Sequence, residues 1–170
     1  MQLDSMRERC VTEALLALQG SLYRLARSYV HSPEDAMDLV QECAYRALKN
    51  RDKLRDMAGV KPWLYKILIN LALDRVKGRR REAPMAEPPE QPSLDSHERM
   101  ELNELLASLD AKSRAVLILH YFEDMPLPQV ARALGENLNT IKSRERRALL
   151  ALRRQAEERM DGNGQPSKAY

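Results

Sequence analysis

The sequence is poor in the residues that support several common classes of protein. It has six glycines, one tryptophan, one phenylalanine and two cysteines among 170 residues. Cys10 and Cys43 lie far apart with no CxxC spacing, so we expect two reduced thiols, in or near the core, of a cytoplasmic protein. The amino-terminal segment MQLDSMRERC lacks the apolar core of a secretory signal. No apolar run reaches the ~18 residues of a membrane-spanning helix, so we expect no membrane insertion.

The motifs of enzymes and metal proteins are also missing. His31, His97 and His120 share no ligand spacing, which argues against a metal site. There is no glycine-rich phosphate loop, and neither cysteine has a basic or histidine partner at a recognisable spacing. We therefore expect no enzyme activity, no cofactor and no small-molecule substrate.

What the sequence does contain favours an all-α fold. Leucine, alanine, arginine and glutamate dominate, and no run of β-branched residues alternates with polar ones. Residues 81–94 form a proline-rich, acidic segment that predicts a flexible linker. The prediction is two independent small domains, a helical bundle at 1–80 and a helix-turn-helix bundle at 95–158, followed by a disordered tail at 159–170.

The amino-terminal domain begins with three predicted helices. Ser5 with Glu8 forms a capping box for the first, which we expect to end at Gly20 before a second short helix. Ser32 and Pro33 supply the cap and first position of the third. Its outer face is acidic, because residues 32–42 hold four acids and no base. Such a face can be simply solvated, or it can bind a partner.

A loop is predicted over residues 50–60, and Pro62 then opens a helix that runs to Arg80. Apolar residues occupy most of its faces and leave one narrow polar stripe, at spacings of four, four and three. That stripe consists of Lys66, Asn70, Asp74 and Lys77. A helix buried on most sides keeps a polar stripe only where it meets solvent or a ligand. Three further basic residues follow the stripe, Arg79, Arg80 and Arg81.

The carboxy-terminal domain carries the strongest local pattern. A helix is predicted from Asp95 to about Ser108, and Asp110 caps the next. The predicted core of that next helix is Ala115, Val116, Leu117, Leu119 and Phe122. A short helix from Leu127 then ends at Gly135.

A basic helix opens after Asn137, a good N-cap residue. Residues 142–154 hold six bases and one acid, a net charge of +5. Ala131 and Gly135 stand where two helices of a helix-turn-helix must approach closely. In such a motif the second helix lies in the DNA major groove, whereas the alternative is a solvated basic face on a helical hairpin.

Three segments, in this order, resemble the extracytoplasmic-function group of bacterial RNA polymerase sigma factors. The first, SPEDAMDLVQECAYRAL, resembles the core helix of region two. The second, KPWLYKILINLALDRVKGRRR, resembles the promoter-melting helix. The third, SLDAKSRAVLILHYFEDMPLPQVARALGENLNTIKSRERRAL, resembles region four. One helix-turn-helix alone would be a weak signal, but three ordered motifs are a strong one.

The resemblance implies a role for each candidate residue in the amino-terminal domain. Asp38, Gln41 and Glu42 would dock on the clamp helices of core RNA polymerase. The polar stripe of Lys66, Asn70, Asp74 and Lys77 would face the minus-ten element, and the 50–60 loop would hold a flipped base. Arg79, Arg80 and Arg81 would bind phosphates.

In region four, the family reads the minus-thirty-five element at the positions of Thr140, Lys142, Ser143, Arg144 and Arg147. Which of them contact base edges and which contact phosphates stays open. Glu136 and Glu145 stand where this family usually has aliphatic residues. The carboxylate of Glu145 would lie either near the DNA or in a seam between helices.

The resemblance also implies the partners of the chain. These are core RNA polymerase, double-stranded and melted promoter DNA, and an anti-sigma factor. The protein would be cytoplasmic, associated with the nucleoid when active, or held at the membrane by the anti-sigma factor. The alternative is a stand-alone helix-turn-helix regulator with a sensing or dimerising domain at residues 1–80, which would bind duplex DNA without polymerase.

Overall fold

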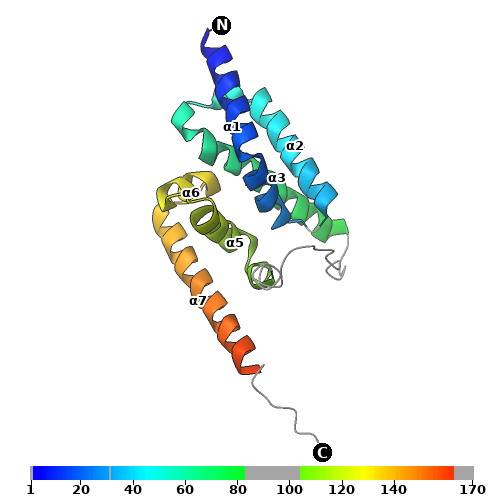
Figure 1. The fold of residues 1–170 in the computed structure, drawn as a ribbon, viewed down its shortest axis with the longest axis vertical. Helices are drawn as coiled ribbons and strands as arrows, with labels where there is room; N and C mark the ends of the chain where they lie inside the picture. The colour runs from blue at the N-terminus through cyan, green and yellow to red at the C-terminus, as the bar shows by residue number, and fades with distance from the viewer. Residues whose placement is uncertain (1, 31, 83–103, 163–170) are drawn as a thin grey trace, which may run out of the picture.

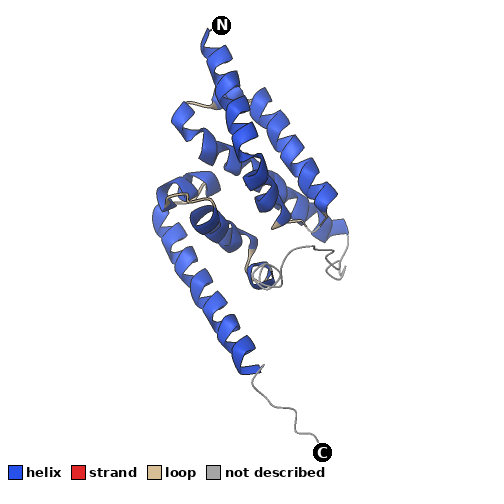
Figure 2. Ribbon diagram, in the orientation of Figure 1, coloured by secondary structure: helices blue, strands red, loops and turns tan. Residues whose placement is uncertain are grey.

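The computed structural model describes residues 2–30, 32–82 and 104–162, and within these ranges every regular element is helical (Figure 2). The amino-terminal half contains α1 (Gln2–Arg27), α2 (Pro33–Lys49) and α3 (Val60–Glu82). The carboxy-terminal half contains α5 (Ala111–Leu117), the π-helix η3 (Ile118–Phe122), α6 (Leu127–Leu134) and α7 (Leu138–Gly162). The predicted all-α fold is confirmed. None of the described helices is both long and apolar enough to cross a bilayer.

The first helix does not break where the sequence predicted. α1 is one continuous helix of 26 residues that passes through Gly20, so the prediction of two helices was wrong. A glycine inside a helix costs only about 1 kcal/mol relative to alanine. Packing outweighs that cost, because α1 buries Val11, Leu22 and Leu25 completely. One long rod therefore lies along both α2 and α3 (Figure 1).

The start of α2 follows its predicted chemistry. The Ser32 hydroxyl accepts a hydrogen bond from the Asp35 backbone N–H at 3.3 Å, and Pro33 is the first helical residue. The following loop contains only the short 3₁₀ turns η1 (Arg51–Lys53) and η2 (Met57–Gly59). α3 begins at Val60, two residues before the predicted position. It can include Pro62, because the N–H groups of a first helical turn have no partner within the helix.

The core of the amino-terminal half lies around α3, which contacts both α1 and α2. Tyr65, Leu68 and Ile69 of this helix are buried. A smaller cluster of Val11, Ala47, Leu54 and Leu64 closes the end near the loop. Leu54 thereby anchors the otherwise polar loop to the domain.

The carboxy-terminal half begins with a well-formed cap and then departs from the α-helical period. The Asp110 carboxylate accepts from the Ser113 N–H at 3.1 Å, and Ala115, Val116, Leu117 and Leu119 are buried as predicted. Phe122, predicted to be core, is 51% exposed. The reason is the π-helix, in which the Glu123 N–H donates to the Ile118 carbonyl five residues back. This wider turn shifts later residues out of the α-helical register.

The helix-turn-helix is present as predicted. Gly135 ends α6 with φ of +66°, and the Asn137 side chain caps α7 by accepting from the Thr140 N–H at 2.8 Å. Close approach does not explain the glycine, because a Cβ atom at residue 135 would meet nothing within 4 Å. Its left-handed backbone conformation explains it instead. α7 extends to Gly162, beyond the predicted domain end at residue 158.

Parts of the predicted organisation lie outside the described residues. These parts are most of the linker at 81–94, the start of the helix predicted from Asp95, and the tail after residue 162. Residues 104–107 are helical, as predicted for the end of that helix.

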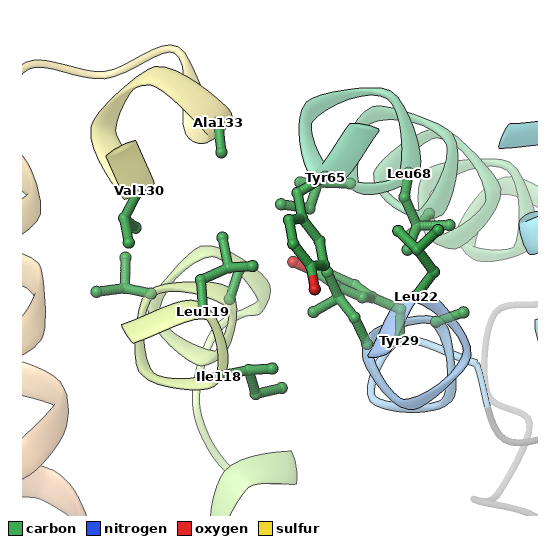
Figure 3. Close-up of a cluster of buried hydrophobic side chains, with 14 of the residues drawn as sticks. Leu22, Tyr29, Tyr65, Leu68, Ile118, Leu119, Val130 and Ala133 are labelled. Atoms are coloured by element: carbon green, nitrogen blue, oxygen red, sulfur yellow. The ribbon is translucent and has the colours of Figure 1, made fainter. Parts of the chain in front are cut away.

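The two halves are not independent bodies in this structure. Helix α6 packs on α3, and one apolar cluster continues from the amino-terminal half into the carboxy-terminal half (Figure 3). We call this contact surface the interdomain seam. Leu22, Tyr29 and Tyr65 line one side of it, and Ile118, Leu119, Val130 and Ala133 line the other.

A cluster of charged side chains joins α5 to the helix-turn-helix. Arg144 of α7 pairs with Asp110 at 3.4 Å and with Glu136 at 3.3 Å. Lys112 also pairs with Glu136, at 2.6 Å. The hydrogen bond from Lys112 and the nearby Arg144 charge outweigh partial burial and lower the pKa of Glu136 below its ordinary value. This cluster fixes the angle at which α7 leaves the turn.

Two glycine substitutions should have opposite effects on the free energy of unfolding. Gly20→Ala should raise it by about 0.5–1 kcal/mol, because alanine favours the helix and only the end of the flexible Arg24 side chain lies near the new Cβ, at 3.4 Å. Gly135→Ala should lower it by about 1–2 kcal/mol, because alanine is strained at φ of +66°. Urea unfolding midpoints measure both changes. A loss of stability in Gly20→Ala would contradict the continuous α1.

Glu136→Gln should make stability less dependent on acidic pH. A carboxylate with a lowered folded-state pKa stabilises the fold above its unfolded pKa, and this stabilisation is lost as pH falls through the folded value. The variant should therefore melt below the wild type at pH 7, and the difference should shrink toward pH 3. Thermal melts across this range test the effect. Glu157→Gln is the control, because Glu157 pairs with Arg153 on an exposed face of α7; parallel curves for Glu136→Gln and wild type would refute the assignment.

Candidate nucleic-acid interface

The predicted polar stripe on α3 is present. Between residues 61 and 78, the only exposed residues are Lys66, Asn70, Asp74 and Lys77. The other faces of the helix meet α1, α2 and α6. The stripe is therefore a single line of two cations, one amide and one carboxylate along a rigid, buried helix. Arg79, Arg80 and Arg81 continue the same helix to its end at Glu82.

The loop before α3 adds charge near the start of that helix. Lys53 and Arg55 are exposed, whereas Arg51 pairs with Asp4 of α1 at 2.8 Å and with Glu8 at 3.6 Å. The Asp56 side chain accepts from the Ala58 N–H at 3.0 Å and so shapes the second short turn. The start of the loop is thus held against α1 by Arg51, whereas Lys53 and Arg55 are exposed to solvent.

A second surface lies on the outer face of α2. Asp38 and Gln41 are exposed, and Glu42 is half-buried and pairs with Arg46 at 2.6 Å. These residues line an open groove of about 640 Å³ between α2 and α3, together with Leu39, Tyr45, Leu71 and Arg75. Arg75 reaches Asp35 at 3.3 Å and ties the two helices together at this groove.

Sequence reasoning missed the apolar members of this face. Met37 is 52% exposed and Tyr45 is 58% exposed, beside the acids on α2. A signal was available, since both fall outside the apolar stripe that buries Ala36, Leu39 and Cys43. Single exposed apolar side chains are common on protein surfaces, so these two are candidates for contact with a partner only because they lie beside the acids of α2.

The third surface is the outer face of α7 after its cap. Lys142, Ser143 and Arg147 are exposed, as expected of residues that reach DNA, whereas Thr140 is half-buried. The Arg147 Nε donates to the Ser143 carbonyl at 3.3 Å. Arg146 is exposed as well, and sequence reasoning missed it. Its spacing of four residues from Lys142 and three from Ser143 places it on the same face and could have identified it.

Arg144 differs from its neighbours on α7. Its side chain is only 19% exposed and is held by the carboxylates of Asp110 and Glu136. Two carboxylates of the protein therefore already compensate its charge. The unusual Glu136 is thus part of the scaffold.

The other unusual carboxylate, Glu145, lies between α7 and the π-helix. It accepts a hydrogen bond from the Tyr121 hydroxyl at 3.0 Å and lies 3.5 Å from His120 Nε2. Its side chain is 15% exposed. The sequence left two positions open for this carboxylate, near the DNA or between helices, and the second is the one observed. The hydrogen bond to Tyr121 of the π-helix holds α7 at a second point.

The buried Cys43 is not placed to act as a nucleophile. Cys43 is fully buried, its Sγ lies 3.6 Å from the Leu64 carbonyl oxygen, and burial raises its pKa to about 12. A thiol that stays protonated is a poor nucleophile. In the described ranges, no three His, Cys, Asp or Glu side chains gather closely enough to hold a metal ion.

Comparison with known proteins agrees with this arrangement of surfaces. Residues 15–82 match the family described as Sigma-70 region 2, and residues 105–154 match Sigma-70, region 4. The first match covers the α2 face and the α3 stripe, and the second covers the helix-turn-helix. Both candidate DNA surfaces therefore lie inside matched regions.

Several relatives match over most of their length. RNA polymerase sigma factor SigV of Bacillus subtilis is 34% identical over 157 residues, which are 87% of this chain and 95% of that protein. RNA polymerase sigma-E factor of Streptomyces coelicolor is 34% identical over 79% of each chain. ECF RNA polymerase sigma factor SigM of Mycobacterium tuberculosis is 32% identical over 78% of this chain and 70% of that one.

Two solved structures have the same fold as this chain. The sigma factor RpoE of Bartonella quintana, in complex with the anti-sigma factor NepR, superposes with a TM-score of 0.74 at 25% identity, covering 86% of this chain and 96% of that one. CnrH, solved with the cytosolic domain of CnrY, has the same fold, with a TM-score of 0.70 at 22% identity over 92% and 96% of the two chains. With both regions matched in order and long relatives above 30% identity, this chain belongs to the extracytoplasmic-function group of the sigma-70 family of RNA polymerase sigma factors.

Proposed function

We propose that this chain binds core RNA polymerase and directs it to promoters that carry two separate recognition elements. The observation that carries this proposal is the α3 stripe, four polar residues left exposed on a helix that is covered elsewhere, within the region 2 match. A stand-alone regulator would need only the helix-turn-helix, and it would not account for the match of residues 15–82 to region 2. The chain acts as an initiation factor and not as an enzyme.

The α2 face is the proposed polymerase-binding surface. Asp38, Gln41 and Glu42 supply polar contacts, and the exposed Met37 and Tyr45 supply apolar area beside them. A mixed surface of this kind, with an aromatic anchor and a polar rim, is typical of protein interfaces. The groove between α2 and α3 would accept a side chain of the partner.

The α3 stripe is the proposed surface for the minus-ten element. Asn70 carries both a donor and acceptors and can bind a base edge, whereas Lys66 and Lys77 suit phosphates. Arg79, Arg80 and Arg81 would extend the phosphate contacts, and the loop at 50–60 would hold an extruded base. Capturing a base outside the stack offsets an unstacking cost of a few kcal/mol and so favours strand opening.

The proposed minus-thirty-five surface is the exposed face of α7. Lys142, Ser143, Arg146 and Arg147 form its centre, and Thr140 lies at its edge. Arg144 contributes by holding the angle of the helix through Asp110 and Glu136. Recognition helices contact base edges with residues of their amino-terminal part, and Lys142 lies in the second turn of α7.

An anti-sigma factor is the proposed regulator. The relative RpoE was crystallised with the anti-sigma factor NepR, and that structure covers 86% of this chain. We place the protein in the cytoplasm, on the nucleoid when active and held at the membrane if its anti-sigma factor is a membrane protein.

Purified chain added to bacterial core RNA polymerase and a library of promoter fragments should redirect transcription to templates that share two short elements. The reason is that the polymerase would hold both DNA-binding surfaces at the required separation. Sequencing of transcript starts measures this selection. A stand-alone regulator would instead bind duplex fragments without polymerase and leave the start sites unchanged.

Asn70→Ala and Lys142→Ala should impair different steps. Asn70→Ala should slow strand opening, and a template with a pre-melted minus-ten region should restore its activity. Lys142→Ala should weaken promoter binding about tenfold, from loss of a contact worth ~1–3 kcal/mol, and the pre-melted template should not restore it.

Permanganate footprinting measures the opening, and binding titrations at several salt concentrations measure affinity. Gln19→Ala, an exposed change on α1, is the control. Equal rescue of both variants by the pre-melted template would contradict the division of roles.

A further inference from the structure

The recognition helix α7 is held on two sides by charged contacts of opposite sign. On one side its Arg144 lies between two carboxylates, at 3.4 and 3.3 Å. On the other side its Glu145 meets His120 and Tyr121 of the π-helix. Successive helical residues point to different sides of the axis, so the two contacts together restrict the rotation of α7 about its own axis. Without one of them, α7 keeps a charged contact on one side only.

The geometry of His120 favours a proton on both of its ring nitrogens. Its Nδ1 lies 2.8 Å from the Met125 carbonyl oxygen, which can only accept a hydrogen bond, so Nδ1 is a donor. Its Nε2 lies 3.5 Å from Glu145 Oε1, and an ionised carboxylate also only accepts. A neutral imidazole has a proton on one nitrogen and would turn a lone pair toward this carboxylate. The arrangement therefore fits the imidazolium cation.

The position of His120 in the fold favours the same charge. It lies in the last turn of the helical segment formed by α5 and the π-helix, where the carbonyl end of the helix attracts a cation. Its side chain is 30% exposed and that of Glu145 is 15% exposed, so water screens the pair only in part. The Tyr121 hydroxyl donates to the same Glu145 oxygen at 3.0 Å. With a neutral imidazole, this hydroxyl would be the one remaining donor to the carboxylate among the described residues.

The other charged groups around the π-helix have partners of their own or are exposed. Glu123 pairs with Arg24 and accepts from Tyr65, and Lys61 donates to its carbonyl. On α5, α6 and α7, Lys112 pairs with Glu136, Arg114 donates to backbone carbonyls, and the exposed cations are Arg132, Lys142 and Arg146. The hydrogen bond to Glu145 raises the pKa of Tyr121, so the phenol keeps its proton. Histidine is thus the one side chain of this cluster that ordinarily changes charge near neutral pH.

We infer that His120, as an imidazolium, positions the recognition helix through Glu145, and that recognition of the minus-thirty-five element weakens as pH rises and His120 loses its charge. The inference rests on the proposed function, because it concerns the α7 face assigned there to DNA. The ion pair stabilises the position of α7 while the imidazole is charged, and this stabilisation is lost as pH rises through the range in which histidine is deprotonated. The Arg144 guanidinium stays charged throughout that range.

The charge of Glu145 acts on DNA binding in the same direction. Glu145 lies three residues after Lys142 and next to Arg146, both exposed on the face proposed for the minus-thirty-five element. While His120 is charged, it compensates the carboxylate. When His120 is neutral, one negative charge remains beside these cations and reduces their attraction for DNA phosphates.

Coupling between the two residues tests the ion pair without DNA. His120→Asn keeps a donor for the Met125 carbonyl in place of Nδ1 and has no atom in place of Nε2. Glu145→Gln keeps the size of the side chain and an acceptor for Tyr121 but removes the charge. Thermal melts of the full-length wild type, both single variants and the double variant should show a coupling at about pH 6 that is much smaller at about pH 8. A coupling that is absent, or equal at the two pH values, would overturn the inference.

The consequence for DNA is measured with holoenzyme reconstituted from core polymerase. The measured quantity is the ratio of its affinities for a promoter with an intact minus-thirty-five element and for the same promoter with that element scrambled. This ratio removes pH effects that arise in the polymerase itself. For wild type it should fall about threefold between pH 6 and pH 8, the effect of a partly exposed ion pair. For His120→Asn and for Glu145→Gln it should change little.

The other histidines provide a matched control, because the chain has only three. The double variant His31→Asn/His97→Asn should keep the pH dependence of wild type. If His120 instead contacted DNA phosphates directly, the ratio would still depend on pH in Glu145→Gln, and that result would overturn the positioning role. Circular dichroism checks the folding of each variant. If His120→Asn does not fold, Glu145→Gln provides the same comparison with wild type.

The two measurements separate this inference from the proposed function. A pH-dependent coupling together with a pH-dependent affinity ratio would support both. A pH-dependent coupling in a chain whose holoenzyme selects no promoter would support the His120–Glu145 ion pair and overturn the proposed function. Promoter selection by wild type with a ratio that is the same at pH 6 and pH 8 would overturn only the inference.

Discussion

The structure depends on how α3 is buried. Three neighbours, α1, α2 and α6, pack against this one helix. The hydrophobic effect, which favours this packing, is not directional. The part of α3 that stays exposed is therefore determined by how the three neighbouring helices are arranged around it. That remainder is a line one side chain wide, which holds Lys66, Asn70, Asp74 and Lys77 in fixed spacing. A polar surface built in this way needs no loop to order it.

Local chemistry explains what could be predicted from the sequence. Ser32, Asp110 and Asn137 cap helices through hydrogen bonds to residues three positions away, so their effect is visible in a short window. Gly135 is equally local, because its conformation is left-handed. The polar stripe on α3 was also predictable, since a helical period needs only the sequence of that helix.

Features that depend on distant partners were not predictable. Gly20 resembles a helix end, and only the packing of α1 along two other helices overrides it. Arg144 counts as one more cation in a basic helix until Asp110, 34 residues earlier, is seen beside it. The same limit applies to the interdomain seam, where Tyr65 and Glu123 meet across 58 residues of chain. Charge counts identify a basic helix but cannot say which of its cations are available to DNA.

The π-helix at Ile118–Phe122 has a consequence for how this chain can change over evolution. A π turn is in effect one residue added to an α-helix, and here it ends on Glu123, whose N–H closes the wide ring. Loss of one residue from this turn would return the segment to ordinary α-helical winding and swing Glu123 by about 100° around the axis. Its carboxylate would then point away from Tyr65. A single codon deletion would therefore remove the Tyr65–Glu123 hydrogen bond between the two halves.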